Sequence, residues 1–244
     1  MCLIDDARRP KLPSNDLLLD VLKRYARTLA GRFDAAEVLD ELIGHVVEVL
    51  GASAAGVSLD AGDGELRFAN ASTAEARRLE AAQEATQHGP CVESFRRREP
   101  VVVSNHEGLD KWPEFSKVAR EVGVVAVAGI PLILDEKTLG ALNIYDTRPR
   151  EWTTEDIAIA SVFADIATSY VLHATQLLEA RQINEQLQKA LDSRVLVEQA
   201  KGLIAGERGI SVDASFEILR RHARNNNVTL RSVADAVVHL GLRP

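Results

Sequence analysis

The apolar positions of the first fifty residues follow the three-and-four spacing of two amphipathic helices. Asn15 or Asp16 would cap the first helix. Its apolar face would hold Leu18, Leu22, Tyr25 and Leu29. Asp34 and Glu37 resemble a capping box for the second helix, and Gly51 is a suitable stop. The apolar face of the second helix would hold Val38, Leu42, Ile43, Val46 and Leu50.

The next hundred residues change to short apolar runs separated by turn residues, which indicates strands. Asp63-Gly64 is a strong hairpin dipeptide, Gly89-Pro90 ends a charged helix over 73–87, and Trp112-Pro113 opens another helix. Five strands are predicted, over 54–59, 65–69, 100–104, 122–134 and 138–146. The pattern predicts an α+β fold, with a mixed, mainly antiparallel sheet flanked by helices.

A long helical pattern follows the last predicted strand. Thr153 and Asp156 would cap it, and no Gly or Pro occurs between Glu151 and Lys201. A helix over 153–193 would connect two modules and pair with a second copy, although Gln182 and Glu185 interrupt its heptads. Two shorter helices, over 212–225 and 230–240, complete a small three-helix all-α unit, with a turn at 225–227.

Length and composition agree with two modules in one globular chain. The 244 residues exceed one small domain, taking roughly 100 to 200 residues per domain, and no run approaches the roughly 20 apolar residues of a membrane span. The first six residues carry acids where a signal peptide would be basic, so we expect a cytoplasmic protein without membrane association. Two cysteines, Cys2 and Cys91, exclude a disulfide framework and a thiolate zinc site.

Charge is distributed unevenly along the chain. The net charge is −7, but residues 190–244 carry eight Lys and Arg against six Asp and Glu, so that this tail is +2 and the remainder −9. A sign change that coincides with a change in sequence pattern indicates two modules with different partners. An acidic first module would repel nucleic acid and leave contact to the tail.

On helical wheels, the cations of the tail lie at the edges of the predicted apolar faces. Six of them would form a phosphate-binding surface: Arg194, Lys201, Arg220, Arg221, Arg224 and Arg231. Arg and Lys suit phosphate oxygens, and phosphate contacts dominate nucleic-acid affinity. The alternative is that these cations form ordinary solvated faces.

The order of residues in the tail resembles the ANTAR family. The resemblance lies in 197–204 (VEQAKGLI), 209–212 (GISV), 216–223 (FEILRRHA) and 230–234 (LRSVA), and covers nearly all of 190–240. It implies a three-helix RNA-binding domain of antitermination regulators that binds tandem hairpins in leader transcripts. Ser215 departs from the alanine usual in that family.

Residues 15–172 resemble a GAF sensor domain. The resemblance lies in 89–91 (GPC), 100–103 (PVVV), 112–113 (WP), 130–132 (IPL) and 139–145 (LGALNIY). It implies a pocket on one face of the sheet, whose ligand varies among members. No cyclic-nucleotide signature or tetrapyrrole attachment site is present, so the cofactor stays unknown.

Three residues are candidates for ligand or redox sensing in that pocket. Cys91 follows Gly89-Pro90 at a predicted helix start, where amide dipoles would favour a thiolate, although a buried packing role is the more common one. Trp112 would wall the pocket or cap a helix, and Asn143 lies in the last predicted strand. The six histidines form no metal-ligand spacing.

These observations predict a signal-responsive RNA-binding antitermination regulator that is a homodimer and not an enzyme. The predicted organisation is an N-terminal arm at 1–14, a sensor domain at 15–172, the connecting helix at 153–193 overlapping both domains, and an RNA-binding domain at 186–240. Asn225 or Asn226 would read loop bases. The alternatives are a DNA-binding transcription factor and a protein-interaction module. A GAF-type reductase of oxidised methionine would need more cysteines than the domain has.

Overall fold

A computed structural model describes residues 15–29 and 34–244 of the chain. The predicted N-terminal arm, 1–14, and Cys2 lie outside the described residues. The chain divides into two compact units, Met1–Ala174 and Thr175–Pro244. Each unit is described by itself.

The first unit is built on a five-stranded sheet of order β2-β1-β5-β4-β3. The strands are β1 (Ala54–Asp60), β2 (Leu66–Ala71), β3 (Val101–Val103), β4 (Ala126–Leu134) and β5 (Lys137–Asp146). All strand pairings of the described residues are antiparallel, so the parallel component expected of a mixed sheet is not found there. The α+β class is confirmed.

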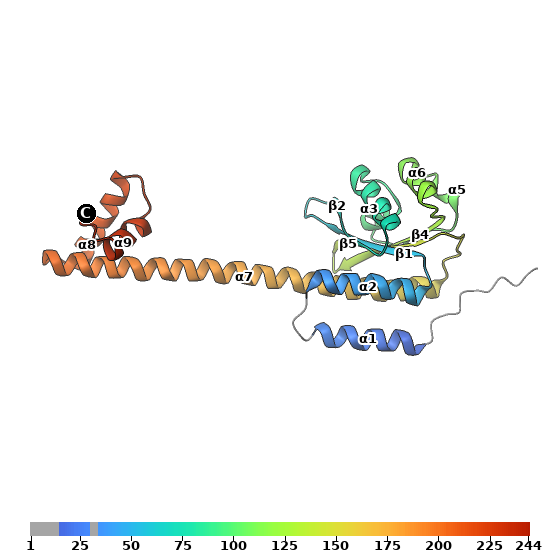
Figure 1. The fold of residues 1–244 in the computed structure, drawn as a ribbon, viewed down its shortest axis with the longest axis horizontal. Coiled ribbons are helices and arrows are strands. Elements are labelled where there is room, and N and C mark those ends of the chain that lie inside the picture. Colours follow the sequence, from blue (N-terminus) through green and yellow to red (C-terminus); the bar gives the residue numbers. More distant parts are fainter. Residues whose placement is uncertain (1–14, 30–33) are drawn as a thin grey trace, which may run out of the picture. The chain divides into compact units, whose positions relative to one another are not determined.

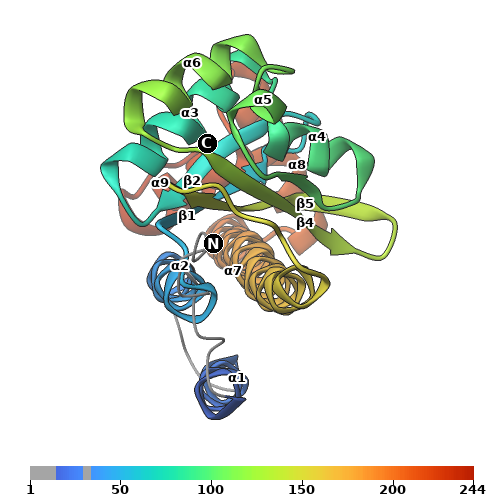
Figure 2. The ribbon, with the colours of Figure 1, turned by 90° about the vertical axis from the view of Figure 1, so that its right-hand side faces the viewer.

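Helices cover both faces of this sheet (Figure 2). One face packs against α2 (Ala35–Leu50) and the start of α7 (Thr154–Arg208). The other face lies under α3 (Ala74–Thr86), α4 (Pro90–Arg97), α5 (His106–Leu109) and α6 (Pro113–Val122). The first helix, α1 (Asn15–Leu29), lies outside α2, where the Tyr25 hydroxyl is 2.8 Å from His45 Nδ1.

Strand β5 lies at the centre of the sheet and divides its side chains between the two cores. Leu142 and Ile144 belong to the core that contains α2 and α7. Ala141 and Tyr145 belong to the core beneath α3, α4 and α6. Because strand residues alternate between faces, Asn143 points to the side of Ala141 and Tyr145. This alternation places a polar side chain in the middle of the second core.

Local sequence signals set both ends of α2 and the start of α7 as predicted. The Asp34 carboxylate accepts from Ala36 N at 2.8 Å, and Gly51 ends α2 in the left-handed conformation at φ 57°. Thr153 N donates to Asp156 Oδ2 at 3.1 Å and Asp156 N donates to Thr153 Oγ1 at 3.0 Å, which completes a capping box for α7.

The strand predicted over 122–134 was wrong at its start. Val122 ends α6, Gly123 caps that helix at φ 77°, and β4 begins only at Ala126. The apolar run continues through both elements, so the spacing of apolar residues does not mark the boundary. Gly123, which adopts the positive φ readily, marks it instead.

Helix α7 has 55 residues and extends to Arg208. By length and composition it could cross a membrane, since an 18-residue window has a mean hydropathy of 1.5. This finding corrects the expectation that no stretch of the chain approaches the apolar length of a membrane span. A third of that window is buried in the protein. Part of the apolar content of α7 serves the core of the first unit, through Ala160, Phe163, Ala164 and Ala167.

The second unit packs the end of α7 against α8 (Val212–Asn225) and α9 (Leu230–His239) (Figure 1). Its buried core holds Val197, Ala200, Ile204, Leu219, Ala223, Val233, Ala234 and Val237. Ser211 caps α8 and Thr229 caps α9, each by accepting a bond from a backbone N–H of the first turn. Between the helices, Asn227 takes a left-handed conformation at φ 52°.

Candidate functional site

Helix α3 buries a carboxylate in the core of the first unit. Its buried residues are Ala76, Leu79, Glu80 and Gln83. These positions share one helical face, so the same spacing that places Leu79 in the core also places Glu80 there. Glu80 has an exposed fraction of 0%.

Four short hydrogen bonds hold the Glu80 carboxylate. Asn143 Nδ2 lies 2.7 Å from both of its oxygens. Ser58 Oγ donates to Oε2 at 2.8 Å, and the Tyr145 hydroxyl donates to Oε1 at 2.9 Å. We call Glu80, Ser58, Asn143 and Tyr145 the Glu80 cluster. All the donors are uncharged, so the carboxylate is solvated by dipoles alone.

Burial changes the titration of the cluster. It raises the pKa of Glu80 from 4.5 to about 6, although the bonds from Asn143, Ser58 and Tyr145 favour the charged form and limit the rise. Burial also raises the pKa of the Tyr145 hydroxyl and of the neighbouring Cys91 thiol far above their ordinary values. A carboxyl group that titrates close to neutral pH is therefore surrounded by groups that stay protonated.

Tight packing fills the space around the cluster. A Cβ atom built on Gly56 would lie 2.3 Å from Glu80 Oε1, and one on Gly89 would lie 2.2 Å from Gln83 Oε1. Gln83 Oε1 in turn accepts a bond from Cys91 N at 3.0 Å. At this place on the sheet, where a ligand pocket was expected, side chains of the protein itself occupy the space.

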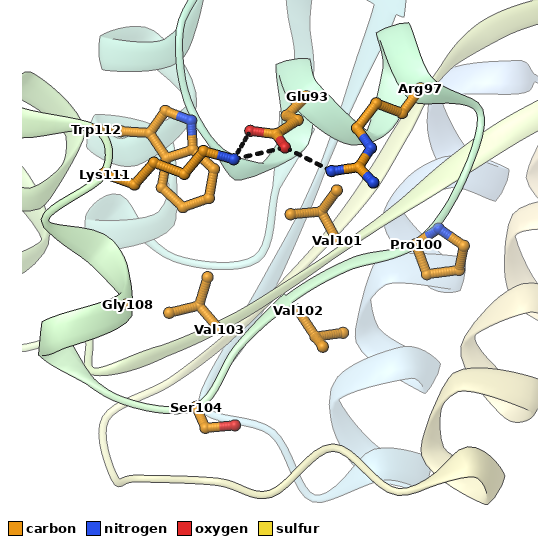
Figure 3. Close-up of a pocket in the computed structure, with 10 residues that line it drawn as sticks. All are labelled: Glu93, Arg97, Pro100, Val101, Val102, Val103, Ser104, Gly108, Lys111 and Trp112. Atoms are coloured by element: carbon orange, nitrogen blue, oxygen red, sulfur yellow. Dashed lines mark hydrogen bonds and ion pairs between the residues drawn. The ribbon is translucent and has the colours of Figure 1, made fainter.

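An open cavity of about 410 Å³ lies beside β3 instead (Figure 3). On one side it is lined by Val101, Val102 and Val103. On the other, Glu93 accepts bonds from Lys111 Nζ at 2.6 Å and from Arg97 Nη1 at 2.9 Å. The bond from Lys111 is the main reason that the pKa of Glu93 is lowered.

The three sensing candidates do not meet in this cavity. Trp112 lines it, with Lys111 Nζ 4.9 Å from the ring centroid, and also precedes α6 as its N-cap residue. Asn143 is buried in the Glu80 cluster. Cys91 is 1% exposed, and its raised pKa opposes the predicted thiolate, so the packing role fits this residue.

The second unit carries a cleft of about 440 Å³. Its lining combines an aromatic ring, two cations and one amide with apolar groups. The residues are Phe216, Arg220, Ala223, Arg224, Asn227, Val228 and Leu230. Arg220 and Arg224 are 55% and 64% exposed, and each lies within 4 Å of Glu217. The structure therefore brings two of the six predicted cations to one cleft.

Lys201 contributes to this region through Phe216. Its Nζ lies 5.5 Å from the centroid of that ring and donates to both Glu198 oxygens at 2.9 Å. Only 14% of the Lys201 side chain is exposed. The ammonium group is held in place, in contrast to Arg220 and Arg224.

The remaining predicted cations, Arg194, Arg221 and Arg231, are exposed but do not line the cleft. Asn225 and Asn226, expected to read bases, do not line it either, whereas Asn227 does. Across residues 15–29 and 34–244, no group of three or more His, Cys, Asp or Glu is placed to hold a metal ion.

Comparison with family models identifies both units. The GAF domain model matches residues 34–170, more than half of the chain. The chain belongs to the GAF family. The ANTAR domain model matches residues 185–238, which confirms the GAF–ANTAR architecture. Both families are regulatory and signalling domains, and ANTAR domains bind RNA.

Solved structures support the GAF fold. The GAF domain of an Acinetobacter phosphoenolpyruvate-protein phosphotransferase is 15% identical, with a TM-score of 0.52, over 67% of this chain and 98% of that one. The GAF domain of the corresponding Coxiella burnetii enzyme is 18% identical, with the same TM-score of 0.52 and the same coverages of 67% and 98%. No curated protein matches the chain.

Sequence reasoning missed Glu80 and the cleft residues Phe216 and Asn227. Glu80 carried a readable signal, because it occupies the apolar face of α3 beside Ala76 and Leu79. Phe216 lies in segment 216–223, which resembles the ANTAR family, and the structure shows that its side chain is only partly buried. Asn227 carried no signal, because its place in the cleft depends on the turn conformation.

Proposed function

We propose that this GAF–ANTAR protein is a cytoplasmic antitermination regulator, not an enzyme, whose GAF domain receives a signal and whose ANTAR domain binds tandem hairpins in leader transcripts. The cleft formed by Phe216, Arg220, Arg224 and Asn227 is the observation that carries this proposal. Proteins read single-stranded loops by stacking unpaired bases on aromatic rings or guanidinium planes and by hydrogen bonds from amides. The cleft supplies all three groups.

The six predicted cations would take different parts in RNA binding. Arg220 and Arg224 would contact phosphate or a loop base at the cleft, since their exposed pairs with Glu217 cost little to break. Lys201 would hold Phe216 in position for stacking. Arg194, Arg221 and Arg231 would add phosphate contacts around the cleft.

The exposed face of α7 supports a homodimer. Leu177, Ala180, Asn184, Leu187 and Leu191 follow one another at spacings of three and four. Three of these are leucines with exposed side chains. A sustained apolar seam of this spacing pairs helices, and one Asn in such a seam sets register. The predicted connecting helix, 153–193, would thus present two ANTAR domains to two hairpins.

A small ligand of the GAF domain would bind in the cavity beside β3. Arg97 and Lys111 in its lining share one acid, Glu93, which leaves one positive charge in excess, and with the valines of β3 this favours an anion with an apolar part. Native mass spectrometry of the full chain reports both a retained ligand and the dimer. A monomer without ligand would contradict this part of the proposal.

RNA binding is tested by competition. The full chain should retain a labelled tandem-hairpin RNA in a gel shift when duplex DNA is added in excess, and Arg220→Ala and Lys201→Ala should each weaken retention at fixed salt. Displacement by duplex DNA would favour a DNA-binding regulator. Unchanged affinity in both variants would show that the cleft region does not hold the RNA.

A further inference from the structure

We propose that the Glu80 cluster is a proton-binding site through which the GAF domain responds to pH. The cluster lies in the GAF core and shares no residue with the lining of the cavity beside β3, and the proposed RNA interface does not use it. Glu80 is fully buried, and four contacts with uncharged donors hold its carboxylate. Within the described part of the chain, the groups that act on this carboxylate are Asn143, Ser58 and Tyr145, and no Lys, Arg or His is among them.

The elements packed against Glu80 bring no cation to it. Strand β5 contributes Tyr145 and the start of α4 contributes Cys91, both with raised pKa values, and β1 contributes the Ser58 hydroxyl. On α3 itself, Arg77 lies over the Phe68 ring, Arg78 pairs with Glu121 of α6, and Glu84 accepts from Phe68 N, so these charged groups are engaged elsewhere. An added proton would therefore discharge a buried anion without breaking a salt bridge.

Asn143 Oδ1 could accept a hydrogen bond from the protonated Glu80 carboxyl. Asn143 Oδ1 is buried and has no hydrogen-bond partner, while its Nδ2 faces both Glu80 oxygens at 2.7 Å. A protonated carboxyl donates from one oxygen, and that oxygen becomes a much weaker acceptor for Asn143 Nδ2. Rotation of the Asn143 amide by half a turn would bring Oδ1 to the carboxyl O–H. Proton uptake and an amide rotation in β5 are thereby linked.

Strand β5 connects this change to α7. The neighbours of Asn143 in the strand, Leu142 and Ile144, lie in the same core as Ala160 and Phe163 of α7. Because a packed core transmits small displacements, a shift of β5 would be felt by α7. That helix is continuous to Arg208. This signalling half of the inference rests on the proposed RNA-binding function, whereas proton binding does not.

Carbon-13 NMR of the glutamate carboxyl groups in the full chain tests proton binding. One glutamate should titrate with a midpoint near pH 6, and this resonance should vanish in Glu80→Gln but persist in Glu75→Gln, which removes an exposed carboxylate from the same helix. Ser58→Ala should move the midpoint to higher pH, because it removes a donor to the charged form. A resonance that stays in Glu80→Gln, or that is absent from the unaltered chain, overturns the proposal.

RNA affinity tests the signalling half. The ratio of Kd values at pH 5.8 and pH 7.5 should differ at least threefold between Glu80→Gln and the unaltered chain, with Glu75→Gln following the latter. All three proteins share the same ANTAR domain, so any pH dependence of that domain itself cancels in the comparison. Equal ratios overturn the signalling half. Absence of RNA binding at every pH contradicts the proposed function itself, and the carboxyl titration still decides proton binding.

Discussion

The two domains treat charge in opposite ways. The GAF domain places the Glu80 carboxylate at 0% exposure and surrounds it with fixed dipoles. The ANTAR domain leaves Arg220 and Arg224 more than half exposed, with one acid, Glu217, shared between them. A buried charge is costly and fixes its neighbours, whereas an exposed one costs little and is free to change partner. The first arrangement suits an internal signal, and the second suits a ligand that arrives from solvent.

The largest effect is expected from filling the space beside the buried carboxylate. Gly56→Ala would place a Cβ atom 2.3 Å from Glu80 Oε1, and the hydrogen bonds of Glu80 prevent it from moving aside. We expect the free energy of unfolding of the GAF domain to fall by about 3 kcal/mol. Gly44→Ala in α2 is the control, because a Cβ atom added there would meet no neighbouring group within 4 Å. Urea unfolding measures the stability of both variants. Equal stabilities would show that the Glu80 cluster rearranges at little cost to make room for the added Cβ atom.

The pH dependence of GAF stability should show the next largest effect. Below pH 4.5 Glu80 is protonated in both states. Between pH 4.5 and about 6 the unfolded chain loses its proton while the folded one keeps it, so stability falls as pH rises. Above that range the loss is complete, at about 2 kcal/mol.

Glu80→Gln removes this contribution. Urea unfolding of both proteins from pH 4 to 8 should give a stability difference that changes by about 2 kcal/mol in favour of the variant as pH rises. Glu75→Gln, with its exposed carboxylate, should keep the slope of the unaltered chain. A slope that is the same in Glu80→Gln would place the titrating group elsewhere.

Local signals in the sequence predicted much of the fold. Caps such as Asp34 and Thr153, and the left-handed Gly51, act over a few residues and were correctly predicted. The boundary at Val122 was missed because helix and strand share one apolar run. The residues that resemble the GAF and ANTAR families predicted the architecture that the family models confirm.

The candidate sites were less predictable, because they depend on contacts between distant residues. The contact between Glu80 and Asn143 joins positions 63 apart, and only the folded sheet shows that Asn143 solvates a carboxylate. The cleft beside Phe216 needs Asn227 and Val228 from a turn whose path follows from one positive φ angle. The sequence predicted the six cations as one group. Only the structure shows that Lys201 is largely buried and held by Glu198, whereas Arg224 is exposed.

A moderate effect is expected when one exposed cation of the cleft is removed. Arg224→Ala should weaken tandem-hairpin binding about fivefold and reduce the slope of log affinity against log salt by about one, the signature of one lost phosphate contact. Arg243→Ala is the matched control, since Arg243 is an exposed cation of the second unit that pairs with Glu207 and does not line the cleft. Equal losses in both variants would mean that general charge attraction holds the RNA.

The smallest effect should be a gain. Glu217 Oε1 lies 3.6 Å from Arg220 Nη1, and its Oε2 lies 3.9 Å from Arg224 Nη2, so this acid competes with phosphate for both cations. Exposed pairs of this kind contribute about 0.5 kcal/mol, and Glu217→Gln should therefore strengthen hairpin binding only about twofold. Glu207→Gln is the control, because its partner Arg243 is outside the cleft. A tenfold gain would show that Glu217 holds Arg220 and Arg224 strongly. The contrast between exposed, weakly paired charges in the ANTAR domain and a firmly held charge in the GAF domain would then fail.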